Sequence, residues 1–156
     1  MGILANLLKK FRPVELDDKF FGHLTYMKMP KGRISYWEAK KVFAPTGHEI
    51  ELFIDAPAPE QPPDEIQHQF LMSIESKYGE ILVAVETVLR PQFEEWSRKT
   101  LSGTFGDEFT MTSFSIPHAA LHDAQWEMSF ESKTNAQHLF TVSISGQIAT
   151  GVTIDG

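Results

Sequence analysis

The apolar residues of the central segment, 62–97, recur with the spacing of an α-helix. They comprise Ile66, Phe70, Ile74, Tyr78, Ile81, Val85, Val88 and Leu89. Only a helix of about 3.6 residues per turn places such positions on one face. Gly79 within the stripe and Arg90-Pro91 near its end are expected to divide the segment into two helices or to bend it.

Apolar and polar residues alternate on both sides of this segment, and a period of two is the signature of a strand. The predicted strands are 20–29, 33–43 and 48–55 before the helical segment, and 109–116, 126–131 and 138–145 after it. The tail from Gly146 onwards is compatible with a short edge strand, although its glycines are unfavourable there. Because short turns join most of these strands, we expect an α+β fold. Its antiparallel sheet would have about six strands, with the two-part helix on one face.

The same two periodicities identify the residues that should form the core. They include Leu52, Ile54, Phe70, Ile74, Val85, Leu89, Phe114, Phe130, Val142 and Ile144. A buried Phe needs no hydrogen-bond partner, which suits a chain with 12 phenylalanines. Residues 13–156 are therefore predicted to form a single α+β domain.

Residues 1–12 carry a separate pattern. Apolar residues at helical spacing precede Lys9, Lys10 and Arg12, which predicts a short amphipathic helix. Such a helix packs on its own domain, lies on a membrane surface or docks in a groove of a partner. The cations follow the apolar run, whereas in a secretory signal they precede it, so we expect a cytoplasmic protein. No stretch approaches the roughly 20 apolar residues of a transmembrane segment.

The composition of the chain argues against several classes of function. The chain of 156 residues has a formal net charge of −7, which repels phosphate backbones and argues against nucleic-acid binding. An acidic surface is compatible with a basic protein partner, and it is also a common aid to solubility. The absence of cysteine excludes disulfides, thiolate metal sites and a cysteine nucleophile.

Candidate chemistry is sparse. His118 and His122 have the i,i+4 spacing that can present two imidazoles to one metal ion. The glutamate of an HExxH motif and a nearby third ligand are both missing, so these two histidines are weak candidates and no metal site is predicted. The chain has no GxSxG elbow, no P-loop and no GxGxxG fingerprint. We therefore predict no cofactor and no catalytic residue.

Carboxylates and aromatic residues provide the candidate binding residues. Glu49 and Glu51 share one strand face, Glu127 and Glu131 share another, and within one sheet the four would form an acidic patch. Such a patch is a solvated face, a protein-binding face or, with perturbed pKa values, an acid–base site. Tyr36 and Trp37 are adjacent, so one of them should lie outside the core and could anchor a partner. The candidate partner-binding residues are Glu49, Glu51, Asp55, Trp37 and Tyr36.

The Tyr36-Trp37 pair, the proline-rich connector after residue 55 and the helix positions Gln67, Phe70, Ile74, Glu75 and Tyr78 resemble small uncharacterised bacterial domains. Some of those families are suspected immunity proteins of polymorphic toxin systems. The resemblance covers residues 20–90 and implies no catalytic residues.

We therefore expect a non-enzymatic protein-interaction domain, such as an immunity or accessory protein, that uses an acidic surface. The alternative is a small enzyme or ligand-binding protein with a pocket at the helix–sheet junction. A third hypothesis is peripheral membrane contact through residues 1–12.

Overall fold

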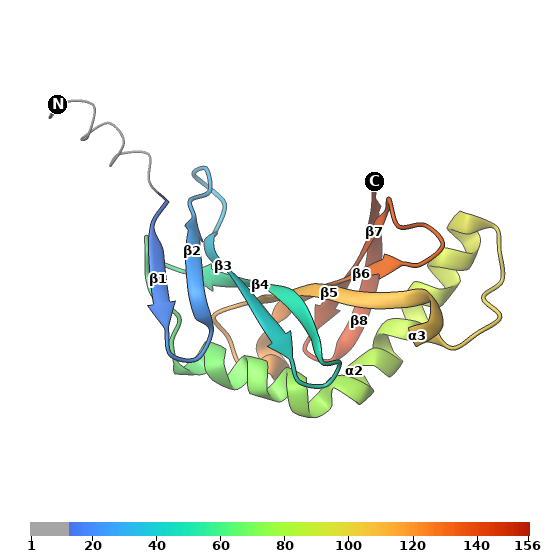
Figure 1. Ribbon diagram of the computed structural model, residues 1–156, viewed down its shortest axis with the longest axis horizontal. Helices are drawn as coiled ribbons and strands as arrows, with labels where there is room; N and C mark the ends of the chain where they lie inside the picture. The colour runs from blue at the N-terminus through green and yellow to red at the C-terminus, as the bar shows by residue number, and fades with distance from the viewer. Residues whose placement is uncertain (1–12) are drawn as a thin grey trace, which may run out of the picture.

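In the part of the chain that follows residue 12, eight strands form one sheet, and a long helix crosses one of its faces (Figure 1). The computed structural model describes residues 13–156, so the helix expected at residues 1–12 lies outside the described part of the chain. The strands are β1 (Glu15–Asp18), β2 (Gly22–Met27), β3 (Ser35–Phe43), β4 (His48–Ala56), β5 (Phe109–Ile116), β6 (Gln125–Ser132), β7 (Leu139–Ser145) and β8 (Ile148–Asp155). The helices of this described part are α2 (Glu65–Ser97), the short α3 (Phe105–Glu108) and the 3-10 turn η1 (Leu121–Asp123). The predicted α+β class is confirmed.

Sheet order follows chain order from β1 to β8, and every neighbouring pair but one is antiparallel. The exception is β4 and β5, which are parallel and pair only over Glu51–Ile54 and Ser113–Ile116. We name this pairing the β4–β5 seam. The expectation of a wholly antiparallel sheet is wrong at the seam. Because α2 carries the chain back along the sheet between β4 and β5, both strands run in the same direction.

Two of the strands, β1 and β8, were not among the predicted six. β1 has only four residues, three of them acidic, so it lacks the hydrophobic alternation that reveals a strand. β8 is eight residues long despite Gly151, which lies opposite Ser143 on β7. Pairing with β7 along its length and contact with α2 hold it in the sheet. Strand propensity is weaker than such tertiary context.

α2 is one helix, so the predicted division at Gly79 and Arg90-Pro91 is wrong. Gly79 lies on the exposed side of the helix, where glycine costs about 1 kcal/mol. Pro91 lies between two buried residues, Leu89 and Phe93, which are 0% and 2% exposed. A proline inside a helix costs about 3 kcal/mol. Burying a Leu or Phe side chain contributes roughly 1.5–3 kcal/mol each, so packing on both sides outweighs the break.

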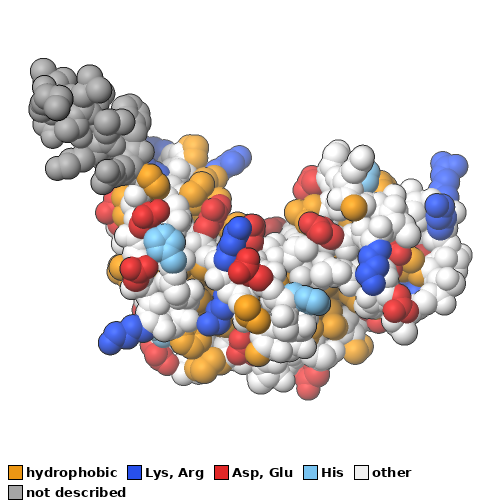
Figure 2. Space-filling view, viewed as in Figure 1, with side chains coloured by type: hydrophobic (Ala, Val, Ile, Leu, Met, Phe, Trp, Pro, Cys, Tyr) orange, Lys and Arg blue, Asp and Glu red, His pale blue; other side chains and the backbone are white. Residues whose placement is uncertain are grey.

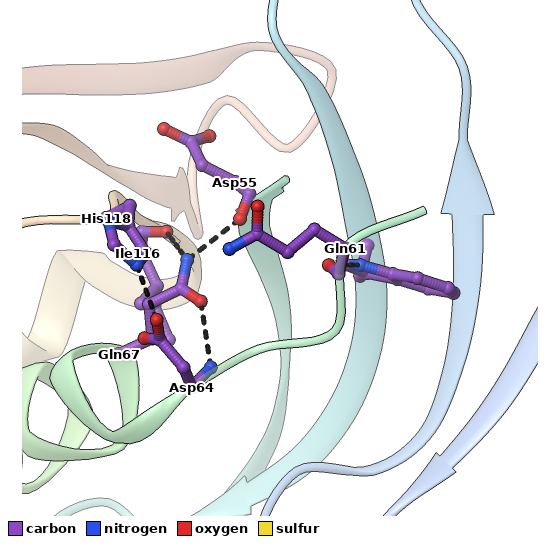
Figure 3. A network of polar contacts seen from close by, with 7 residues as sticks. Asp55, Gln61, Asp64, Gln67, Ile116 and His118 are labelled. Atoms are coloured by element: carbon purple, nitrogen blue, oxygen red, sulfur yellow. Dashed lines mark hydrogen bonds and ion pairs between the residues drawn. The ribbon is translucent and has the colours of Figure 1, made fainter. Parts of the chain in front are cut away.

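The crossover into α2 is held by the side chain of Gln67, which is 1% exposed (Figure 3). Its amide nitrogen donates to the carbonyl of Asp55 in β4 at 2.8 Å and to that of Ile116, at the end of β5, at 3.5 Å. Its amide oxygen accepts a hydrogen bond from the backbone nitrogen of Asp64 at 3.3 Å. One side chain thus joins the helix start to the ends of both strands of the seam.

The core lies between α2 and the sheet. All ten predicted core residues are buried, with exposures of 2% or less, which confirms both periodicities. Aromatic rings fill much of this layer: Phe70 meets Trp126 edge to face at 5.5 Å, and Phe93 meets Phe109 at 5.0 Å. One face of the sheet is thereby covered by the helix, and the opposite face is left to solvent.

Candidate functional site

The sheet face turned away from α2, here called the open face, is curved. Figure 1 shows its strands rising on both sides of the centre, with the helix beneath. Figure 2 shows the molecular surface hollowed between the end of the sheet formed by β1–β3 and the end formed by β6–β8. Side chains alternate along each strand, so every second residue lies on this face. The open face is therefore the principal concave surface in Figure 2.

The open face is acidic. Nine strand carboxylates lie on it: Glu15, Asp17, Glu38, Glu49, Glu51, Asp55, Glu127, Glu131 and Asp155. Lys40 and Lys41 are the only lysine or arginine residues in the strands of residues 13–156, and Lys41 lies on the other face, where its Nζ donates to the Phe20 carbonyl. The imidazole of His23 lies between two carboxylates: its Nδ1 is 3.0 Å from Asp17 Oδ1, and its Nε2 is 3.6 Å from Glu15 Oε1. The hydrogen bond with Asp17 raises the pKa of His23 above its usual value of 6.5.

A row of directly opposed residues crosses the open face from β3 to β8. Its members in strand order are Lys40, Glu51, Ser113, Ser129, Thr141 and Thr153. The row is charged on β3 and β4 and consists of hydroxyl groups from β5 onwards, where Ser129 and Thr141 are hydrogen-bonded at 2.9 Å. The strip of hydroxyl groups formed by Ser113, Ser129, Thr141 and Thr153 was not predicted from the sequence. The alternation of Ser and Thr with apolar residues in 109–116 and 139–145 is the signal that could have identified it.

A groove of about 450 Å³ lies on the open face beside the seam. Its walls include Lys40, Glu49, Glu51, Phe53, Ser113 and Glu131. Three of the four carboxylates that the sequence suggested would form a patch therefore meet in one groove. Glu127 lies outside this group of lining residues. Its backbone N–H donates to the hydroxyl of Ser115 on β5 at 2.9 Å.

The remaining candidate binding residues lie in different environments. Trp37 is 2% exposed and its indole N–H donates to the carbonyl of Gln61 at 2.8 Å, so it belongs to the core and to the crossover and cannot contact a partner. Tyr36 lies on the open face, where its ring meets Phe53 edge to face at 5.7 Å. Asp55 is opposite Tyr36, and burial raises the pKa of its carboxyl above the usual value of 3.8. As expected, one of the adjacent aromatic residues lies outside the core.

His118 and His122, the two histidines with the spacing of metal ligands, contact different carboxylates. His118 Nε2 lies 2.6 Å from Asp64 Oδ2 at the start of α2 (Figure 3), whereas His122 Nε2 lies 3.0 Å from the adjacent Asp123. Across residues 13–156 no group of three or more His, Asp and Glu residues is arranged to hold a metal ion. His118 thus links the β5–β6 connection to the helix start.

The helix–sheet junction contains a cavity of about 420 Å³. Apolar side chains dominate its wall, among them Leu82, Phe105 and Met111, and His48 and Glu86 also line it. Tyr78 lies there too, and burial raises the pKa of its hydroxyl to about 12. Glu86 is engaged with Arg90 at 2.7 Å, so the polar groups do not converge on one point. The cavity suits an apolar ligand better than acid–base chemistry.

In residues 13–156, no helix has the length and apolar character needed to cross a membrane. Comparison of the chain with protein-family models, curated proteins and solved structures found no match.

Proposed function

We propose that this protein is a non-enzymatic interaction domain that binds a basic partner protein on its open face. The observation that carries the proposal is the charge of that face: nine carboxylates and one lysine among the described strand residues. Opposite charge on a partner would steer the encounter and select the partner. An immunity or accessory role belongs to this class, and the resemblance of residues 20–90 favours it.

The concave shape supports the same proposal. α2 covers the other face and makes it a core layer, so the open face is the sheet surface that a partner can reach. Its exposed side chains are charged groups, hydroxyls and a few apolar residues such as Val42 and Leu139, which are 60% and 36% exposed. A polar rim around isolated apolar contacts is typical of interfaces between proteins that also exist apart.

Charge reversal on β4 tests the proposal. The tagged protein and its Glu49→Lys/Glu51→Lys variant are used for affinity capture from the native host, with proteins quantified by mass spectrometry. The matched control, Glu80→Lys/Glu95→Lys, makes the same charge change on exposed positions of α2. We expect specific partners to be lost from the β4 variant and retained by the control. Identical partners in all three captures would contradict the proposal.

A second candidate function is binding of a small apolar ligand in the cavity at the helix–sheet junction. The cavity volume of about 420 Å³ favours it, because ligand sites of this kind are about 300–1,000 Å³. The probe is the fluorescent dye 1-anilinonaphthalene-8-sulfonate. Gly106 lines the cavity and an added Cβ there meets no heavy atom within 4 Å, so Gly106→Leu should fill it. Dye fluorescence that is equal in the wild type and in this variant would exclude the cavity as the site.

A further inference from the structure

The groove on the open face exists because β4 and β5 diverge. Their pairing begins at Glu51 and Ser113, so the preceding residues, 48–50 of β4 and 109–112 of β5, separate from one another. The side chains beside this gap belong to β3, β4, β5, β6 and β7. Strands that are distant in sequence thereby contribute to one small site.

The charges in the groove are not neutralised within the described chain. Glu49, Glu51 and Glu131 line it together with Lys40. Among residues 13–156, none of these four side chains has an ion-pair partner within 4.0 Å. Three carboxylates and one ammonium group leave the groove with two negative charges to be balanced. A cationic group is the ligand that this balance favours.

Ser113 gives an independent indication of a ligand. It is 8% exposed and lies on the groove wall between Glu51 of β4 and Ser129 of β6. Its hydroxyl has no hydrogen-bond partner among the described residues, whereas the neighbouring Ser129 hydroxyl is bonded to Thr141. The Ser113 hydroxyl is open to the groove and free, so it can accept a hydrogen bond from a ligand that donates an N–H.

The apolar part of the wall distinguishes between the two cationic side chains. Phe53 presents an aromatic ring to the groove, and Leu139 presents an exposed aliphatic side chain from β7. A guanidinium group stacks on aromatic faces and directs five N–H donors in a plane, so it can contact an aromatic ring, carboxylates and a hydroxyl together. An ammonium group is more strongly hydrated and lacks this planar geometry. The groove therefore fits arginine better than lysine.

We propose that this groove binds the guanidinium group of an arginine side chain presented by the partner protein. The inference rests on the proposed function and adds the chemical group that anchors the partner. Glu51 and Glu131 hold the guanidinium from opposite walls, Ser113 accepts one of its N–H groups, and Phe53 lies against its plane. Lys40 competes with it for the same carboxylates.

The groove can be tested without the partner. The probe is N-acetyl-arginine amide, titrated into ¹⁵N-labelled protein while backbone amide shifts are followed by NMR. We expect saturable shifts at Glu51, Ser113 and Glu131. N-acetyl-citrulline amide has nearly the same shape but no charge, and it should bind at least ten times more weakly. Equal shifts with the two probes would overturn the inference.

Three double variants with the same change of charge locate the site. Glu51→Gln/Glu131→Gln should weaken arginine amide binding at least tenfold. Glu80→Gln/Glu95→Gln, on the exposed side of α2, should change it less than twofold. Glu15→Gln/Glu38→Gln, on β1 and β3 of the same open face, should also have a small effect. Equal weakening by all three would show that only general charge attraction is measured, and would overturn the inference.

Lys40→Gln gives a test in the opposite direction. Removal of the competing ammonium group should strengthen arginine amide binding several-fold, whereas damage to the fold would weaken it. Unchanged or weaker binding would contradict the arrangement in the groove.

If Glu49→Lys/Glu51→Lys loses its protein partners while arginine amide shows no groove binding, the proposed function stands and this inference alone fails.

Discussion

At the scale of single residues, Gln67 shows why a prominent sequence position need not be functional. Its side chain is buried and joins Asp55 in β4, Ile116 at the end of β5 and Asp64 at the N-cap of α2. The amide has both donors and an acceptor, so it can bond to two carbonyls and one N–H at once. In the residue pattern that resembles the bacterial domains, Gln67 therefore has a structural role.

Replacement of Gln67 by leucine should be strongly destabilising. The change leaves the carbonyls of Asp55 and Ile116 and the backbone N–H of Asp64 without their side-chain partner. Unsatisfied buried polar groups cost about 1–3 kcal/mol each. We expect the free energy of unfolding to fall by about 2–4 kcal/mol in urea denaturation. The matched control is Gln69→Leu, two residues later on the same helix. Gln69 is exposed and bonded to Glu65 at 2.7 Å, so its loss should cost less than about 0.5 kcal/mol.

Phe70 tests the hydrophobic stripe itself. The ring is 1% exposed and packs against Trp126, so Phe70→Ala should lower the free energy of unfolding by about 3–5 kcal/mol. Met72 lies on the same helix with 40% exposure, and Met72→Ala should cost less than about 1 kcal/mol. Denaturant melts of the two variants should therefore differ clearly, and a loss under about 1 kcal/mol for Phe70→Ala would show that the stripe is not buried.

At the scale of elements, Glu108 connects α3 to the β6–β7 hairpin. One of its carboxylate oxygens accepts hydrogen bonds from the hydroxyls of Ser132 and Thr134 and from the backbone nitrogen of Thr134. Burial acts to raise the pKa of Glu108, but these hydrogen bonds outweigh it and lower the pKa below its usual value of 4.5. The ionised carboxylate thus stabilises the hairpin.

The contribution of Glu108 should depend on pH. Because the pKa of Glu108 is lower in the folded state, its stabilising effect is present above about pH 4.5 and is lost as the pH falls toward the folded-state pKa. Glu108→Gln should lower the free energy of unfolding by about 1–2 kcal/mol at neutral pH. The difference between wild type and variant should shrink in denaturant melts below pH 4.5. A difference that stays constant with pH would refute the role of the carboxylate.

Element prediction succeeded where a hydrophobic period ran over many residues and failed where it was short or interrupted. The stripe of α2 and the six strands are examples of success. β1 is too short and too acidic to show a period, and the glycines of β8 obscured one that pairing with β7 enforces. Pro91 is a local signal for a break, but burial of Leu89 and Phe93 outweighs it.

At the scale of the whole molecule, two four-stranded antiparallel units meet at the short β4–β5 seam. α2 lies against both: Tyr78 packs on Phe43 of β3 at 5.0 Å, and Phe93 packs on Phe140 of β7 at 5.4 Å. Four residue pairs at the seam are a small connection, so the continuous helix is the main link between the two units. We therefore expect both to unfold together.

Two tryptophans can report on the two units separately. Trp37 lies on β3 and Trp126 on β6, and both are 2% exposed. In Trp96→Phe/Trp126→Phe the fluorescence comes from Trp37 alone, and in Trp96→Phe/Trp37→Phe it comes from Trp126 alone. Within each variant, the fluorescence and far-ultraviolet circular dichroism midpoints in urea should coincide. A fluorescence midpoint that differs from the circular dichroism midpoint would show that the units unfold independently.

The candidate site was predictable only in part. Alternation placed Glu49 and Glu51 on one face of their strand, as the structure has them. Glu131 joins them because β5 and β6 are inserted next to β4 in the sheet, an arrangement without a local sequence signal. Trp37 could not be assigned to the core or the surface, because alternation separates it from Tyr36 without indicating which side α2 covers.

The sequence by itself determined the α+β class, the helical stripe, the core residues and the acidic character of the chain, because these follow from local periodicity and composition. The tertiary structure alone decided the strand order, the parallel seam, the continuity of α2 and the residues that meet in the groove. These features depend on contacts between residues far apart in the chain, where burial of whole faces outweighs local preference. The groove is therefore a product of strand pairing, and its charge is a product of the sequence.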